Sequence, residues 1–310
     1  MVKKLHRYCK NVKYSPLDAL PYLWHGDQTI TKRGALYVQM AISGGKIMND
    51  GIEIIRERNI AEIILNRKET YNAFNLEMVS QLAKHLAVMA VDNSVRGIII
   101  TGNGPSFCAG GDLKWAIAFS EKPGHSFRTL ASLFHLAVTE IRRMKKPVVA
   151  AINGIAAGGG FSLALACDFR IMEKSAILRQ AYTANGLCID GGGTFTLPRI
   201  VGVARALEIA AFDVPISAKL ALEWGLVTKV VEDGSSLEES VILLQKLSAK
   251  SSLYSFGWSK KLINDSFNNS FESHLEWERE GLCECSESAD GQEGLKSFIE
   301  KRKPIFSAFQ

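Results

Sequence analysis

Several common signatures are missing from this sequence, and each absence narrows what the protein can be. The six cysteines form no C-x-x-C pair and show no zinc-type spacing with histidine; they stand at positions 9, 108, 167, 188, 283 and 285. We therefore expect reduced thiols, a cytoplasmic location and no metal site. No apolar run approaches the roughly 18 residues of a membrane span. The N-terminus also lacks a signal-peptide core, so no membrane partner is expected.

The sequence also lacks a long block of charge of one sign. Its 37 basic and 32 acidic residues are interleaved, which gives a formal net charge of only +5 over 310 residues. A weakly basic surface suits an anionic small molecule at least as well as nucleic acid, and we do not expect a nucleic-acid partner. With 47% hydrophobic and 22% charged residues, the composition is typical of a globular protein with one large or two modest domains.

Residue spacing can be compared with two nucleotide-binding motifs and one serine-nucleophile motif, and the sequence matches none of them in full. Phe161, Ser162 and Leu163 follow the glycines 158–160, so no G-x-G-x-x-G can be written there. No G-x-x-x-x-G-K-[ST] phosphate loop occurs either. The stretch GFSLA around Ser162 half resembles a serine nucleophile elbow, but its final glycine is absent and the best histidine, His135, precedes the serine. A serine hydrolase is therefore disfavoured.

Strand-like and helix-like segments alternate from residue 52 onward. Apolar residues at helical spacing (Val79, Leu82, Leu86, Met89) predict a helix over 76–91, and another helix is predicted over 126–144. Short apolar runs bounded by turn residues predict strands within 52–66, 96–102, 145–154, 166–172 and 226–231. This order predicts an α/β fold with parallel strands and a ligand crevice beyond their carboxyl ends.

The chain divides into three regions by composition. Residues 1–50 are basic, aromatic and without clear periodicity, and three interpretations stay open: a docking arm, a targeting segment or sequence upstream of a start at Met48. Residues 51–235 carry the alternating core. Residues 236–310 are predicted to be helical up to about 303 and to form a separate helical layer or lid.

Two glycine-rich loops follow predicted strands and precede predicted helices. They are NGPSFCAGGDLKW at 103–115 and INGIAAGGGFSLALACD at 152–168. A glycine bend at a helix N-terminus leaves free backbone N–H groups, which favour negative charge. Two such sets facing each other would form an oxyanion hole, although each glycine run alone is equally consistent with a tight turn and close helix packing.

Five blocks in order resemble the crotonase, or enoyl-CoA hydratase/isomerase, superfamily. They are FCAGGDL at 107–113, KKPVVAAINGIAAGGGFSLALACD at 145–168, RIVGVARALEIA at 199–210, A-x-E-W-G-L-V at 221–227 and EGLKSFIEKRKPIF at 293–306. The resemblance implies a ββα spiral with a C-terminal helical region, assembled as a homotrimer or a dimer of trimers. It also implies an acyl-CoA thioester as substrate, with coenzyme A part of that substrate and no permanently bound cofactor.

The resemblance also suggests site residues. The two N–H groups that polarise the thioester carbonyl fall on Ala109 and Gly159. Contacts to coenzyme A are expected along the first glycine loop, near Phe107, Asp112 and Leu113, and a basic side chain of KRKP at 301–304 is a further candidate. One expected phosphate contact lacks its basic residue here: many relatives carry a basic side chain before N-A-L in this segment, whereas NRKETYNAF has Tyr71.

The chain departs from the hydratases of this family at two positions. Where they carry catalytic glutamates, this sequence has Ser162 and Tyr182. Adding water to a double bond needs groups that activate water and manage a proton, and hydroxyls of high pKa do neither well near neutrality. An efficient hydratase is therefore disfavoured, although residual hydratase activity stays possible. Ser162 is interpreted as lining the pocket or packing the helix, and Tyr182 as a substrate-binding residue.

One carboxylate stands where related isomerases keep theirs. Asp190, in NGLCIDGGGTFTLPRIVG at 185–202, resembles the catalytic aspartate of the ring-epoxyphenylacetyl-CoA and dienoyl-CoA isomerase branches. It also resembles the nucleophile of 4-chlorobenzoyl-CoA dehalogenase and an active-site aspartate of dihydroxynaphthoyl-CoA synthase. We predict an enoyl-CoA isomerase in which Asp190 shuttles a proton through a thioester enolate. The competing interpretation is an N-cap of the helix that begins near residue 192.

Two other functions stay open. In the dehalogenase branch, a histidine and an aromatic residue accompany the nucleophilic aspartate, and His135, Tyr182 and Asp190 stand at similar spacings here. His135 is equally consistent with a histidine of the apolar core. Because both glutamates are missing, a non-catalytic acyl-CoA-binding or RNA-binding homologue is the third hypothesis.

Overall fold

The computed structural model describes residues 47–49 and 51–306. The segment expected to be an N-terminal extension, 1–50, lies almost wholly outside the described residues. The strands are β1 (Ile47–Asn49), β2 (Ile52–Glu57), β3 (Ile60–Leu65), β4 (Gly97–Gly102), β5 (Ser106–Cys108), β6 (Val148–Ile152), β7 (Ile155–Ala157), β8 (Phe169–Glu173), β9 (Ile177–Arg179), β10 (Ile216–Ser217) and β11 (Lys229–Val231). The helices are α2 (Leu76–Val91), α3 (Leu113–Phe119), α4 (Pro123–Arg143), α5 (Gly159–Ala166), α6 (Gly193–Phe212), α7 (Ala218–Glu223), α8 (Ser236–Lys250), α9 (Leu253–Asp265), α10 (Phe271–Glu287) and α11 (Ala289–Ile299), with short 3-10 turns η2 (Lys68–Thr70) and η3 (Thr183–Asn185).

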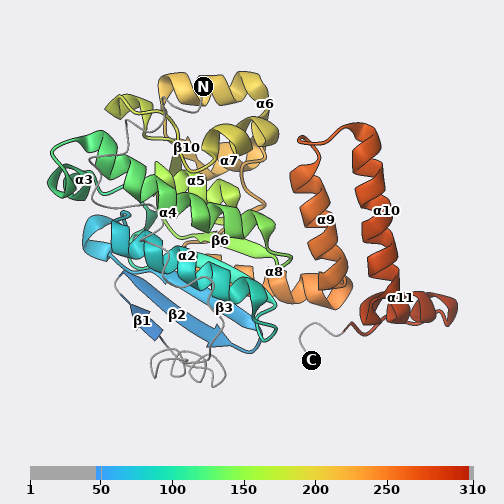
Figure 1. The fold of residues 1–310 in the computed structure, drawn as a ribbon. Helices are drawn as coiled ribbons and strands as arrows, with labels where there is room; N and C mark the ends of the chain where they lie inside the picture. Colours follow the sequence, from blue (N-terminus) through green and yellow to red (C-terminus); the bar gives the residue numbers. More distant parts are fainter. Residues whose placement is uncertain (1–46, 50, 307–310) are drawn as a thin grey trace, which may run out of the picture. The chain divides into compact units, whose positions relative to one another are not determined.

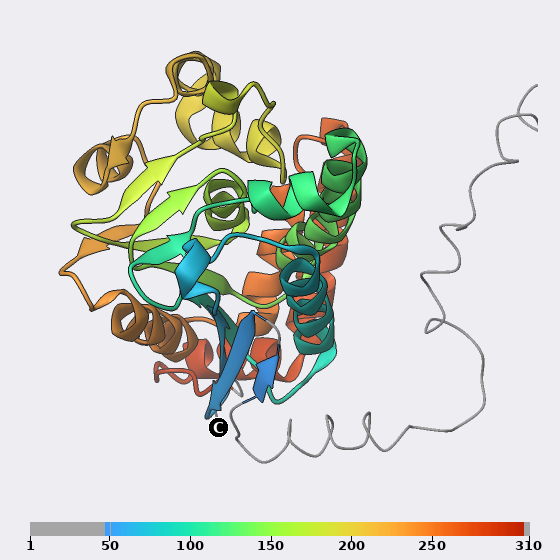
Figure 2. The same cartoon turned by 90° about the vertical axis from the view of Figure 1, so that its left-hand side faces the viewer.

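Two sheets form the frame of the fold. The larger sheet has the strand order β1-β2-β3-β4-β6-β8-β11, antiparallel from β1 to β3 and parallel from β3 onward. The smaller sheet has the order β10-β9-β7-β5, with β5, β7 and β9 parallel. Figures 1 and 2 show the helices packed around these strands.

The chain repeats one ββα unit three times. A strand of the larger sheet is followed at once by a strand of the smaller sheet and then by a helix, as in β4-β5-α3, β6-β7-α5 and β8-β9-α6. Because each unit adds one strand to each sheet, the chain winds as a spiral of turns. The predicted α/β fold with a ββα spiral core is confirmed.

Both faces of the larger sheet are covered, which explains why its central strands are continuously apolar. Ile98 and Ile100 of β4 pack with α2 and α4, whereas Ile99 between them packs on the other face with Leu244 of α8. Side chains alternate across a strand, so one run of isoleucines supplies both cores. Gly97 leaves room for this contact, since a Cβ there would lie 3.0 Å from the Leu244 side chain.

The predicted long elements are confirmed, but several short strands were missed. Helices α2 and α4 cover the predicted ranges, and helices α8 to α11 fill most of 236–303. Figure 1 shows α9 and α10 side by side. The strands β5 and β7 lie inside segments that the sequence suggested were loops. Each has three residues between prolines and glycines, too few for an alternation to be visible.

Candidate active site

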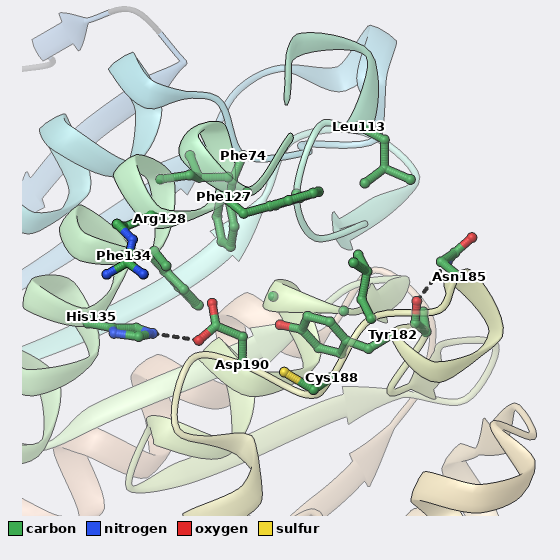
Figure 3. A pocket seen from close by; sticks show the side chains of 18 of the residues that line it. Phe74, Leu113, Phe127, Arg128, Phe134, His135, Tyr182, Asn185, Cys188 and Asp190 are labelled. Carbon is green, nitrogen blue, oxygen red and sulfur yellow. Dashed lines mark hydrogen bonds and ion pairs between the residues drawn. The ribbon is translucent and has the colours of Figure 1, made fainter. Parts of the chain in front are cut away.

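A cavity of about 580 Å³ lies where the glycine loops meet α4. Its lining residues come from the segments after β5, β7 and β9, from α4 and, for Phe74, from the segment before α2. They are Phe74, Ala109, Gly111, Leu113, Gly124, Phe127, Arg128, Leu130, Ala131, Ser132, Phe134, His135, Gly158, Gly159, Ala181, Tyr182, Asn185, Leu187, Cys188 and Asp190. Figure 3 shows Asp190 and His135 facing one another, with Leu113 and Asn185 on the far side of the cavity. Three strand ends of the smaller sheet therefore converge on one apolar pocket with few polar groups.

The two glycine loops touch each other through backbone. Gly110 has φ +93°, and a Cβ there would lie 2.9 Å from the nitrogen of Gly159. Gly158 has φ +53° and precedes α5, while a Cβ on Gly160 would lie 2.1 Å from the carbonyl oxygen of Cys108. Positive φ and this close approach both require glycine. The sequence thus places the end of one loop directly against the N-terminus of α5.

The hydrogen bonds of the first loop correct one expectation. The Ala109 N–H donates to the carbonyl of Tyr71 at 2.9 Å, so the expectation that it is a free donor for a substrate is wrong. The carbonyl of Gly110 and the N–H of Asp112 both bond to Phe74. Because backbone groups alternate sides along an extended segment, the N–H of Gly111 faces away from Phe74. It has no acceptor among the described residues.

Gly159 supplies the second unpaired donor. It is the first residue of α5, so its N–H has no carbonyl one turn earlier in the helix to bond, and no other acceptor is recorded in the described part of the chain. Gly111 and Gly159 both line the cavity. Two backbone donors at the wall of an apolar pocket are the arrangement that stabilises a developing oxyanion. Sequence reasoning missed Gly111 because no residue pattern indicates which N–H of a loop is already used.

Asp190 and His135 form the polar pair of the cavity. His135 Nε2 lies 2.6 Å from Asp190 Oδ1, and their side chains are 51% and 38% exposed. His135 comes from α4, whereas Asp190 precedes α6, so the pair joins residues 55 positions apart. The carboxylate is partly withdrawn from water and opens onto the cavity (Figure 3). A carboxylate held this way is a candidate proton acceptor.

Two alternative interpretations are wrong. Asp190 does not cap a helix with its side chain: α6 begins at Gly193, its N-cap is Gly192, and no side chain accepts a bond there. His135 is not a core histidine, because half of its side chain is exposed and it faces the cavity. In the sequence, the spacing of Asp190 and His135 is equally consistent with structural roles. Only the fold brings the two side chains together.

The two hydroxyl residues lie beside Asp190. Ser162 on α5 is fully buried and donates its hydroxyl to the main-chain carbonyl of Asp190 at 2.6 Å. It therefore packs the helix rather than lining the pocket. Tyr182 lines the cavity, and burial raises its pKa, with a hydrogen bond to Ser162 acting in the opposite direction. A buried tyrosine of raised pKa keeps its proton and cannot serve as a base near neutrality.

The residues expected to contact coenzyme A lie in three different environments. Phe107 is fully buried in the core, so only its backbone remains near the loop. Asp112 caps α3 by accepting the N–H of Trp115 and pairs with Arg67 at 3.0 Å. The pKa of Asp112 lies below its usual value. Burial acts to raise it, but the hydrogen bonds from Trp115 and Arg67 and the positive charge of Arg67 outweigh burial. Leu113, 42% exposed, lines the cavity.

Within 47–49 and 51–306, no group of three His, Cys, Asp or Glu side chains is placed to hold a metal ion. No helix of that part of the chain has the length and apolar character needed to cross a bilayer.

Comparison with known proteins gives a consistent result. The profile of the enoyl-CoA hydratase/isomerase family matches residues 55–308. The 1,2-epoxyphenylacetyl-CoA isomerase of Escherichia coli is 35% identical over 252 residues, which are 81% of this chain and 96% of that protein. The crotonyl-CoA hydratase of Syntrophomonas wolfei is 32% identical and aligned over 83% of this chain and 98% of its own length. The crystal structure of an enoyl-CoA hydratase from Bacillus anthracis has a TM-score of 0.77 at 32% identity, covering 84% of this chain and 100% of that one.

The spiral of ββα units, the paired glycine loops and these matches lead to one conclusion: the chain belongs to the enoyl-CoA hydratase/isomerase family.

Proposed function

We propose that this protein is an enoyl-CoA isomerase that moves a double bond with Asp190 as its single base. The observation that carries the proposal is the Asp190 carboxylate, which opens onto the cavity and is held by His135 at 2.6 Å. Asp190 is the only carboxylate among the cavity-lining residues of the described chain. One base suits a reaction that takes a proton from one carbon and returns it to another.

The reaction balances without water. Asp190 removes a proton from C2 of a 3-enoyl-CoA, and the electron pair moves to the thioester oxygen, forming a dienolate. The N–H groups of Gly111 and Gly159 stabilise the oxygen, which replaces the expected pair of Ala109 and Gly159. The same carboxyl then delivers the proton to C4 while the double bond forms between C2 and C3. His135 keeps the carboxylate oriented through its Nε2.

Hydration fits the site less well. It requires one group to activate water and another to manage the proton at the α-carbon. The other polar groups beside Asp190 are His135, which holds its carboxylate, and the hydroxyls of Ser162 and Tyr182. The relative from Escherichia coli is named an isomerase, whereas that from Syntrophomonas wolfei is named a hydratase. The names support acyl-CoA chemistry, and the missing second carboxylate favours isomerisation. A trimeric or hexameric assembly and a cytoplasmic location remain predictions from the sequence.

The test compares wild type with Asp190→Asn on 3-enoyl-CoA and 2-enoyl-CoA esters in deuterated water, followed by ultraviolet absorbance and mass spectrometry. We expect double-bond migration with wild type and a loss of about 10²- to 10⁴-fold with Asp190→Asn, the usual contribution of a general base. Asp233→Asn, which removes an exposed carboxylate outside the cavity, is the matched control.

Other outcomes point to different chemistry. Hydration that survives Asp190→Asn would refute the one-base mechanism. An acyl or aryl ester covalently attached to Asp190 would instead indicate a nucleophilic carboxylate of the dehalogenase type. Saturable ester binding without turnover would indicate a non-catalytic homologue.

A further inference from the structure

The main chain of Asp190 is held by a fully buried hydroxyl. Ser162 Oγ donates to the Asp190 carbonyl at 2.6 Å, and the N–H of Gly193 donates to the same oxygen at 3.2 Å. Ser162 has no exposed surface, and the cavity is lined by its neighbours Gly158 and Gly159. Ser162 therefore acts on the cavity only through Asp190.

Tyr182 lies at the cavity beside this contact, and both the Ser162 side chain and Asp190 are near enough to influence its pKa. Burial raises that pKa, so Tyr182 keeps its proton near neutrality.

The loop after Asp190 is fitted closely around Ser162. A Cβ on Gly193 would lie 2.7 Å from Ser162 Oγ, and a Cβ on Gly191 would lie 3.0 Å from Ser162 Cβ. Gly191 also has φ +64°, which side chains rarely adopt. Both glycines therefore pack directly against the serine side chain. Removing the hydroxyl therefore leaves the Asp190 carbonyl with fewer donors and a gap beside it.

We propose that Ser162 is a positioning residue for the base, fixing the main chain of Asp190 while His135 fixes its carboxylate. This inference rests on the proposed function, because it assigns Ser162 a role only through the base Asp190. A base held at two points keeps its carboxylate within about 0.5 Å of the geometry that proton transfer requires.

The test compares wild type with Ser162→Ala. Because a misplacement of about 1 Å can cost about 100-fold in rate, we expect Ser162→Ala to lower kcat about 10- to 100-fold with KM changed less than about twofold.

Ser240→Ala is the matched control. Ser240 is also fully buried and donates its hydroxyl to a carbonyl, that of Ser236 at 2.7 Å, but it lies on α8 outside the cavity. It should lose thermal stability by a similar amount and keep kcat. Exchange of the substrate C2 proton with deuterated water, measured on equal amounts of folded protein, separates positioning from unfolding.

The possible results distinguish a failure of the inference about Ser162 from a failure of the proposed function. The inference is overturned if Ser162→Ala keeps wild-type kcat, or if it lowers kcat no more than Ser240→Ala does. If Asp190→Asn is as active as wild type, the proposed function fails first, whatever the serine variants show.

Discussion

Replacing Gly159 by proline removes one N–H from the proposed oxyanion hole and little else. Gly159 is the first residue of α5, the helix position at which proline is best tolerated because its N–H has no helical partner. Its N–H has no acceptor in the described chain, so the substitution breaks no recorded hydrogen bond. A side chain there does meet Phe74, whose ring carbons lie 3.0 and 3.1 Å from the position of a Cβ.

Gly159→Ala is therefore the reference for Gly159→Pro. The alanine adds the same Cβ contact with Phe74 and keeps the N–H, so the difference between the two variants reports the loss of the donor together with the proline ring that takes its place. Loss of one oxyanion-hole donor costs about 2.7–4 kcal/mol of transition-state stabilisation, or about 10²- to 10³-fold in kcat. We expect that difference in the isomerase assay, with both variants folded by circular dichroism and with similar affinity for a saturated acyl-CoA.

The result that contradicts this reasoning is equally specific. If Gly159→Pro and Gly159→Ala have the same kcat, the Gly159 N–H does not hold the developing negative charge. If both variants lose activity equally and bind the saturated ester poorly, the contact with Phe74 has closed the pocket. In that case a Phe74→Leu background relieves the contact, and the comparison of proline with alanine is repeated there.

Two predictions concern stability. Burial, with Lys84 and Arg56 adding to it, lowers the pKa of His85 to about 4 from about 6.5, so below pH 6.5 the unfolded chain binds a proton that the folded chain refuses. The free energy of unfolding should fall as the pH drops from 6.5 to 4, by about 3 kcal/mol from this residue. Urea titrations of wild type and His85→Gln at several pH values measure this fall. Equal dependence of the unfolding free energy on pH in the two proteins would contradict the prediction. Lys260, buried on α9, pairs with Asp168 at 2.7 Å and also donates to the carbonyl of Lys146. Lys260→Met leaves a buried carboxylate unpaired and should cost about 3–5 kcal/mol in urea unfolding, partly restored by adding Asp168→Asn; an unchanged midpoint means that the pair is not needed.

The sequence was sufficient to predict helices with a periodic apolar face and strands with continuous apolar runs. The helical spacing of Val79, Leu82 and Leu86 predicted α2, because one buried face leaves a 3.6-residue period. The apolar runs predicted the strands of the larger sheet, since a sheet covered on both faces needs apolar residues at every position. The ordered glycine and proline blocks indicated the family, and the family match confirms it.

Residue order alone indicates the set of elements, two glycine bends and one carboxylate after a third strand. Which backbone and side-chain groups are free to act follows from the contacts between distant segments. Ala109 and Gly111 are two positions apart, yet the Ala109 N–H donates to Tyr71 and the Gly111 N–H does not. Likewise Asp190 meets His135 and Ser162 across 55 and 28 residues. Hydrogen-bond pairing and long-range contact depend on where backbones meet in space, and residue spacing carries no record of that.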